Sequence, residues 1–252
     1  WEIFNKPGKG DKLSYTFFSI YAKEEGKSPA AKVLESLIQP PYSRDIGFPS
    51  EEAAGLPRLK GSRMKGEYPF VWIDFEDSDI PLELSLEAYT PFIPLNPEDS
   101  GLPCAILKYK AKNIAEKPVE VTIAGSVHNA VGICGASTFG WVEGHNFEGN
   151  INEFRKESGI SGLFMYNKYF KEDYIRYGSM SIMTPREDVT YKQYWLGEHN
   201  YWDGVQDFWD DFSSDGLLEI LSKAVDVEYK PINLRGKQRY CSLGIPATLN
   251  PG

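Results

Sequence analysis

The stretch PLELSLEAYT, residues 81–90, carries the pattern that decides the fold. Its apolar side chains stand at every second position and alternate with mainly polar neighbours: Leu82, Leu84, Leu86 and Ala88. A period of two is typical of a β-strand with one buried and one solvated face. The residues FVWIDFE (70–76) before it are also strand-like, and SDIP (78–81) between the two predicts a short turn.

Two more amphipathic segments follow, CAILKYKAKN (104–113) and PVEVTIAGSV (118–127). Because only the four residues IAEK separate them, the pattern predicts that they form an antiparallel hairpin. In this interpretation Val121 and Ile123 point between the sheets. The side chains expected in water are Lys108, Lys110 and Glu120.

Further strand patterns recur along the chain, in GLFMY, GSMSIMT, VTYKQYW, VDVEYK and RYCSLGIPATL. Turn residues separate them at short intervals, which is typical of a sandwich of two sheets. The stretch from Gln39 to Gly66 is rich in Pro, Gly and Ser without a sustained period, so we expect a long irregular connection. The predicted fold class is all-β: a large two-sheet antiparallel β-sandwich with one or two short helices and long loops. Residues 1–252 are expected to form a single domain.

One helix is expected in DGVQDFWDDF, residues 203–212. Its apolar residues fall at i, i+3, i+4 and i+7, which makes one stripe: Val205, Phe208, Trp209 and Phe212. Asp203 is a candidate N-cap with Gln206 as its capping-box partner. Gly216 is suited to a left-handed turn at the C-terminal end.

Composition excludes several function classes. The formal net charge is −9 and Lys and Arg are not clustered, so the chain is a poor candidate for nucleic-acid binding. No apolar run reaches the roughly 18 residues that a membrane-spanning helix needs. Three cysteines cannot all pair with one another and none lies in a CxxC, which argues against a zinc site or a disulfide scaffold: Cys104, Cys134 and Cys241. Unpaired cysteines lean weakly toward a reducing, cytoplasmic compartment, but the cellular location stays undetermined.

Aromatic residues are concentrated between Tyr191 and Phe212, where 8 of 22 positions are Phe, Trp or Tyr. Such rings belong either to the core and a domain interface or, beside carboxylates, to a sugar site. Trp195 and Trp202 lie outside the helix stripe, so they are expected to remain uncovered by the sheet. The candidate residues for a domain interface or a sugar contact are Trp195, His199, Tyr201, Trp202 and Asp203.

No residue of this chain is assigned a catalytic or metal-binding role. Glycoside hydrolysis needs two carboxylates across the scissile bond. The carboxylates of the helix, however, are predicted to form a solvated face opposite the apolar stripe: Asp203, Asp207, Asp210 and Asp211. The three histidines lack a second His or Cys at ligand spacing: His128, His145 and His199. The sequence also contains no phosphate-binding loop, dinucleotide fingerprint, nucleophile elbow or HExxH motif, and no cofactor is expected.

Three blocks of sequence carry a resemblance to a known family. They are WEIFNKPGKG at residues 1–10, EAYTPFIPLNPEDSGLPCAILKYKAKN at 87–113 and DGVQDFWDDFSSDGLL at 203–218. In this order they resemble the amino-terminal domain of family 116 glycoside hydrolases, the β-glucosidases related to non-lysosomal glucosylceramidase. The resemblance runs from Trp1 to Gly252 and lacks the Gly-rich segment that usually precedes the first block.

The resemblance implies a large β-sandwich followed by an (α/α)6 helical barrel that holds the Glu nucleophile and the Asp acid/base. Both ends of the chain are accordingly interpreted as cuts inside a longer sequence. The leading hypothesis is a non-catalytic sandwich that packs on and supports the barrel of a retaining β-glycosidase. Its expected partner is that barrel, with a β-glucoside at the domain border as a further candidate. The alternative is a sandwich that itself binds carbohydrate through exposed Trp and acidic residues.

Overall fold

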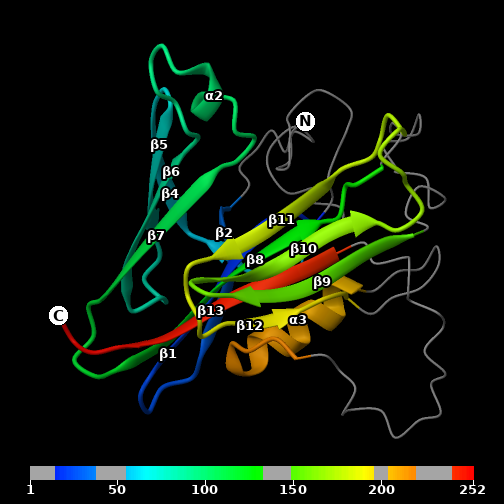
Figure 1. Ribbon diagram of the computed structural model, residues 1–252. Helices are drawn as coiled ribbons and strands as arrows, with labels where there is room; N and C mark the ends of the chain where they lie inside the picture. Colours follow the sequence, from blue (N-terminus) through cyan, green and yellow to red (C-terminus); the bar gives the residue numbers. More distant parts are fainter. Residues whose placement is uncertain (1–14, 38–54, 133–148, 196–203, 220–239) are drawn as a thin grey trace, which may run out of the picture.

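The structure is a computed structural model that describes residues 15–37, 55–132, 149–195, 204–219 and 240–252 (Figure 1). Three sheets are built from its strands. The six-stranded sheet has the order β12 (Thr190–Lys192), β13 (Tyr240–Leu249), β8 (Val119–His128), β1 (Phe17–Glu24), β2 (Ala30–Ser36) and β3 (Arg58–Leu59). The four-stranded sheet has the order β4 (Gly61–Glu67), β5 (Phe70–Glu76), β6 (Leu82–Tyr89) and β7 (Ile106–Asn113). The three-stranded sheet consists of β11 (Ser179–Thr184), β10 (Ile160–Asn167) and β9 (Asn150–Glu157).

The predicted all-β sandwich is confirmed, and one of its two layers is divided between two sheets. Odd-numbered residues of β8 point to one face of the six-stranded sheet. At one end of that face Val121 packs in a cluster with Leu84 of β6. At the other end Val127 packs with Leu163 and Met165 of β10. The four-stranded and three-stranded sheets therefore cover different parts of the same face.

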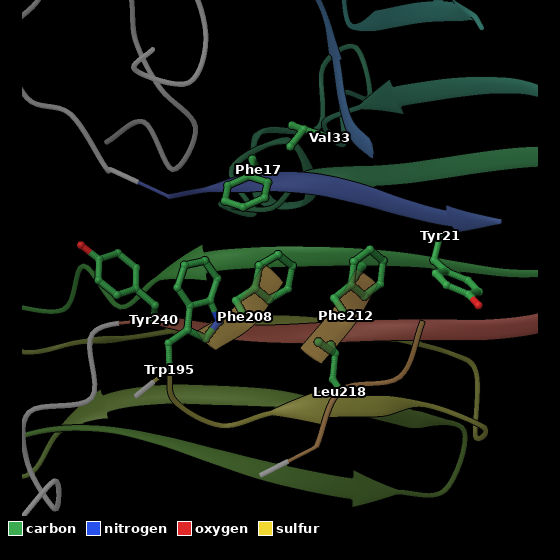
Figure 2. Close-up of a cluster of buried hydrophobic side chains, with 9 residues drawn as sticks. Phe17, Tyr21, Val33, Trp195, Phe208, Phe212, Leu218 and Tyr240 are labelled. Atoms are coloured by element: carbon green, nitrogen blue, oxygen red, sulfur yellow. The ribbon is translucent and has the colours of Figure 1, made fainter. Parts of the chain in front are cut away.

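Helix α3 (Gly204–Asp215) lies on the opposite face of the six-stranded sheet (Figure 1). Its buried Phe208 and Phe212 pack against Phe17, Tyr21 and Ala124 of the sheet, as Figure 2 shows for the aromatic members. The predicted stripe is confirmed, since Val205 and Trp209 pack at the margin of the same cluster. The helix ends as expected: Gly216 has φ +79° and its amide donates to the Phe212 carbonyl at 2.9 Å.

The predicted hairpin of residues 104–113 and 118–127 is wrong. Strand β7 pairs with β6, whereas β8 pairs with β1 and β13 in the other layer. The short connection crosses between the layers, and the buried Asn113 holds it in this conformation. The Asn113 side-chain amide donates to the carbonyls of Lys117 and Leu249, both at 2.8 Å, and its Oδ1 accepts from the Ala115 amide at 2.7 Å. The predicted orientations nevertheless hold, because Val121 and Ile123 pack between the layers and the two lysines and Glu120 are exposed.

Two other expectations are corrected in part. The stretch from Gln39 to Gly66 is not irregular throughout, since β3 and most of β4 lie within it. Strand β4 is almost entirely exposed on both faces, which is why it shows no apolar period. The strands expected in GLFMY, GSMSIMT, VTYKQYW and RYCSLGIPATL correspond to β10, β11, β12 and β13. The one expected in VDVEYK lies outside the described residues.

Candidate functional site

The far end of the four-stranded sheet consists of the β4–β5 turn and the long connection between β6 and β7, and it projects beyond the six-stranded sheet (Figure 1). The connection contains the short helix α2 (Pro97–Ser100). Side chains fix its shape. The Asp99 amide donates to Asn96 Oδ1 at 3.1 Å, which caps the helix. The Ser100 hydroxyl accepts from the Ile93 amide and donates to the Ile93 carbonyl, both at 3.0 Å.

This ordered end presents large apolar side chains to solvent. We call them the apolar tip: Tyr68, Phe92, Ile93 and Leu95. Their exposed fractions are 77%, 46%, 48% and 104%, respectively. The rings of Tyr68 and Phe92 meet edge to face at 5.3 Å between centroids, which joins the turn to the connection. Large exposed apolar patches are typical of sites that interact with a partner, so the apolar tip is a candidate for such a site.

Leu95 is unusual in its backbone as well as in its exposure. Its φ is +64°, in the left-handed region that leucine rarely adopts. Holding a residue there costs on the order of 1–3 kcal/mol, and such strain is concentrated at functional positions. This conformation belongs to the Ile93–Asn96 turn, in which the Asn96 amide donates to the Ile93 carbonyl at 3.0 Å. The turn holds the Leu95 side chain fully exposed, which suits its presentation to another surface.

The outer face of the four-stranded sheet, next to the apolar tip, is a mixed aromatic and charged surface. Trp72 donates its indole N–H to Glu87 at 3.3 Å, and Lys108 approaches the same carboxylate at 3.5 Å. The indole hydrogen bond is the main reason that the pKa of Glu87 lies below its usual value, with Lys108 and Lys110 adding to the effect. The ammonium of Lys108 also lies 4.9 Å from the centre of the Tyr89 ring. A polar border of this kind is typical of the rim of an interface.

Trp195 is not exposed, which corrects the expectation made for it. Only 4% of the residue is accessible, and its ring stacks on Phe208 of α3 at 4.7 Å between centroids. Its indole N–H donates to the Ser242 hydroxyl at 2.8 Å. The hydroxyl that β13 offers at this point satisfies the indole, so the whole side chain can enter the core (Figure 2). The other candidates lie outside the described residues: His199, Tyr201, Trp202 and Asp203.

The predicted solvated acidic face of α3 is also wrong for two of its members. Asp207 and Asp211 point at Lys192 of β12, whose side chain is only 1% exposed. The Lys192 ammonium lies 2.9 Å from Asp211 Oδ2 and 3.6 Å from Asp207 Oδ2, and it donates to the Glu219 carbonyl at 2.7 Å. These carboxylates thus attach the helix to the sheet. Asp210 is exposed as predicted, and Asp203 is outside the described residues.

The structure offers few groups for other chemistry. Within the described residues no group of three or more His, Cys, Asp or Glu side chains is arranged to hold a metal ion. His128 lies in the core, 4.6 Å from the ring of Tyr240. No helix in the described part of the chain is long and apolar enough to cross a membrane.

Fold and surface together define a β-sandwich domain with an ordered, uncovered apolar end. The family whose sequence pattern matches residues 1–252 is described as beta-glucosidase 2, glycosyl-hydrolase family 116 N-term. The chain therefore belongs to the amino-terminal domain family of family 116 glycoside hydrolases, which confirms the resemblance found in the sequence. No curated protein matches the chain in a sequence search.

The apolar tip was missed as a site by the reasoning from sequence. A signal for it was present, because Phe92, Ile93 and Leu95 lie among prolines in a segment without helical or strand period. Apolar side chains in such a connection have no sheet face or helix stripe to bury them. The same segment was one of the blocks that carried the family resemblance.

Proposed function

We propose that this chain is the non-catalytic amino-terminal sandwich of a β-glucosidase-like enzyme, and that it packs on and supports the helical catalytic domain of the same parent chain. The single observation that carries the proposal is the apolar tip. Membership of an amino-terminal domain family implies a catalytic domain in the parent chain, and that domain is the natural partner for this surface. Contacts between domains of one chain typically cover about 600–1,500 Å², which is ample to include the tip and its polar border.

The free energy of docking favours burial of the apolar tip in a contact between domains. Full burial of one leucine or phenylalanine side chain contributes about 1.5–3 kcal/mol relative to leaving it in water. Because hydrogen bonds already hold the connection in place, docking orders little additional chain and costs little conformational entropy. Lys108 and Glu87 then lie at the border, where charged groups remain in contact with water.

The carboxylates of α3 support a non-catalytic role. A glycosidase needs one acid that protonates the leaving group and a second carboxylate that acts as nucleophile or base. Asp207 and Asp211 instead share the ammonium of Lys192 and form part of the attachment of the helix. The catalytic acids of the parent enzyme are accordingly assigned to the helical domain.

The role of the apolar tip is tested by Leu95→Ser with Ile175→Ser as the matched control. Ile175 is also highly exposed, at 92%, but lies in the β10–β11 connection. In the isolated chain both changes should alter the free energy of unfolding by less than about 0.5 kcal/mol. In the full-length parent enzyme, Leu95→Ser should destabilise by about 1.5–3 kcal/mol and lower the Tm, whereas Ile175→Ser should not. Equal effects of the two changes in the parent enzyme would contradict docking through the tip.

The isolated chain is expected not to hydrolyse aryl β-glucosides. The assay is release of nitrophenol from a nitrophenyl β-glucoside by the purified chain, with the parent enzyme as positive control. Turnover that persists through purification and disappears in Asp207→Asn or Asp210→Asn would assign a catalytic acid to this domain and overturn the proposal.

A further inference from the structure

A hollow of about 410 Å³ opens on the outer face of the six-stranded sheet, where α3 ends. Its floor comes from three neighbouring strands, because Thr122 of β8 pairs with Tyr21 of β1 on one side and with Pro246 of β13 on the other. Its wall includes Asp215 and Leu217 at the end of the helix. The hollow therefore lies where the helix stops covering the sheet.

Tyr21 lies at the floor of this hollow. The residue is only 2% exposed and its ring packs against Phe212, at 6.5 Å between centroids. Figure 2 shows the hydroxyl pointing away from Phe212 and the rest of the aromatic cluster. Among the described residues this hydroxyl has no hydrogen-bond partner. The hydroxyl is therefore available for a hydrogen bond with a group that binds in the hollow.

The hollow is also electronegative. Glu120 and Asp215 line the hollow together with Tyr21. Burial is the main cause that raises the pKa of Tyr21, and these two carboxylates raise it further. The C-terminal end of a helix carries a partial negative charge, and the last turn of α3 contains Asp215 but no basic residue. Lys23 lies 3.9 Å from Glu120. Asp215 forms no ion pair within the part of the chain that the structure describes.

We propose that this hollow binds the guanidinium group of an arginine side chain supplied by the helical domain of the parent chain. A guanidinium has five N–H donors in one plane and can donate to several acceptors at once, and the hollow offers two carboxylates and the Tyr21 oxygen. It is also more weakly hydrated than an ammonium, which suits a wall that includes Leu217 and Ala247. The source of the arginine rests on the proposed function, whereas the chemistry of the hollow does not.

The hollow is tested by titrating the 252-residue chain with N-acetyl-arginine amide and following binding by calorimetry or NMR. We expect saturable binding with a millimolar Kd. The lysine amide should bind more weakly, and the neutral citrulline amide should show no saturable binding. Failure of the arginine probe to bind, or equal binding of the citrulline amide, would overturn the proposal. Neither result would affect the evidence from Leu95→Ser, so the two proposals can fail separately.

Variants locate the binding. Asp215→Asn, Glu120→Gln and Tyr21→Phe should each raise the Kd of the arginine probe about threefold or more, since each removes one acceptor or charge. Asp210→Asn is the matched control, because Asp210 is exposed on the same helix, where Gln206 donates to it, and it should leave the Kd unchanged. Unchanged binding in both Asp215→Asn and Glu120→Gln would overturn the assignment to this hollow.

The source of the arginine is tested in the full-length parent enzyme. If the helical domain fills the hollow with its own arginine, the parent enzyme should not bind the probe, while the isolated chain does. Equal binding by the two proteins would show that the hollow is empty in the parent enzyme and would overturn that part of the proposal.

Discussion

Lys192→Met is expected to lower the free energy of unfolding of the chain by about 3–5 kcal/mol. The Lys192 side chain is 1% exposed and its two carboxylate partners, Asp207 and Asp211, are 8% and 13% exposed. Methionine has a similar length but no charge. It would remove the ammonium that both carboxylates contact, while their like charges stay largely removed from water. The measurement is urea unfolding followed by circular dichroism.

The same cluster supplies the controls. Combining Lys192→Met with Asp207→Asn and Asp211→Asn should recover much of the loss, because the uncompensated charges are then gone. Lys156→Met, at an exposed lysine of β9, should change the stability by less than about 0.5 kcal/mol. A loss below about 1 kcal/mol for Lys192→Met, or no recovery in the triple variant, would show that the buried charges do not hold α3 to the sheet.

The cluster of Lys192, Asp207 and Asp211 also illustrates what could not be predicted from the sequence. The helical period correctly predicted α3, its apolar stripe and its glycine C-terminal turn. It also placed the four aspartates off the stripe, but it carried no information about what stands beside them. Lys192 precedes Asp211 by 19 residues and reaches it only because β12 joins the edge of the six-stranded sheet next to β13. An acidic face that looks solvated on one helix can thus be buried by another element.

Strands could be predicted from the sequence where one face of the strand is solvated and the other is buried. The alternation in β6 and β7 identified both strands correctly. Strand β1 (Phe17–Glu24) was not predicted, since the four-stranded sheet covers one of its faces and α3 the other, and its burial hardly alternates. Pairing was harder to predict than strand existence. The β7–β8 connection is short enough for a hairpin, but it crosses between the layers, where the side chain of Asn113 bonds to the Lys117 and Leu249 carbonyls.

The candidate site was the least predictable part. Aromatic density drew attention to Trp195, which in fact fills the core beside Phe208. The density of aromatic residues in the sequence cannot by itself distinguish rings buried in the core from rings exposed at the surface. The apolar tip contains fewer aromatic residues, but its side chains are exposed because the connection that carries them is fixed by its own hydrogen bonds. The lack of a period in this segment indicated that no sheet face or helix stripe buries these side chains, but their exposure depends on the local geometry of the connection.

Val121→Asp is expected to lower the free energy of unfolding by about 3–5 kcal/mol, because it places a charge without a partner between the two layers. Val121 is 5% exposed and lies in a cluster of apolar side chains that includes Ile20 and Leu84. Its neighbours across the ladder are Ala22 of β1 and Ala247 of β13, neither of which can accept or neutralise the charge.

The comparison with Lys110→Asp tests the register of the sandwich. The Lys110 side chain is 68% exposed and lies 3.9 Å from Glu87, so its replacement should cost no more than about 1 kcal/mol.

Burial disfavours the charged form of an acid, so in the folded Val121→Asp variant it raises the pKa of the introduced carboxyl. As pH falls through that raised pKa, the folded state takes up a proton. The difference in the free energy of unfolding between the Val121→Asp variant and the unmodified chain should therefore narrow from about pH 8 to about pH 5. If this difference stays constant over the pH range, the lost stability comes from the changed shape of the side chain and not from its charge. Equal small losses for Val121→Asp and Lys110→Asp would place Val121 on the wrong face of β8.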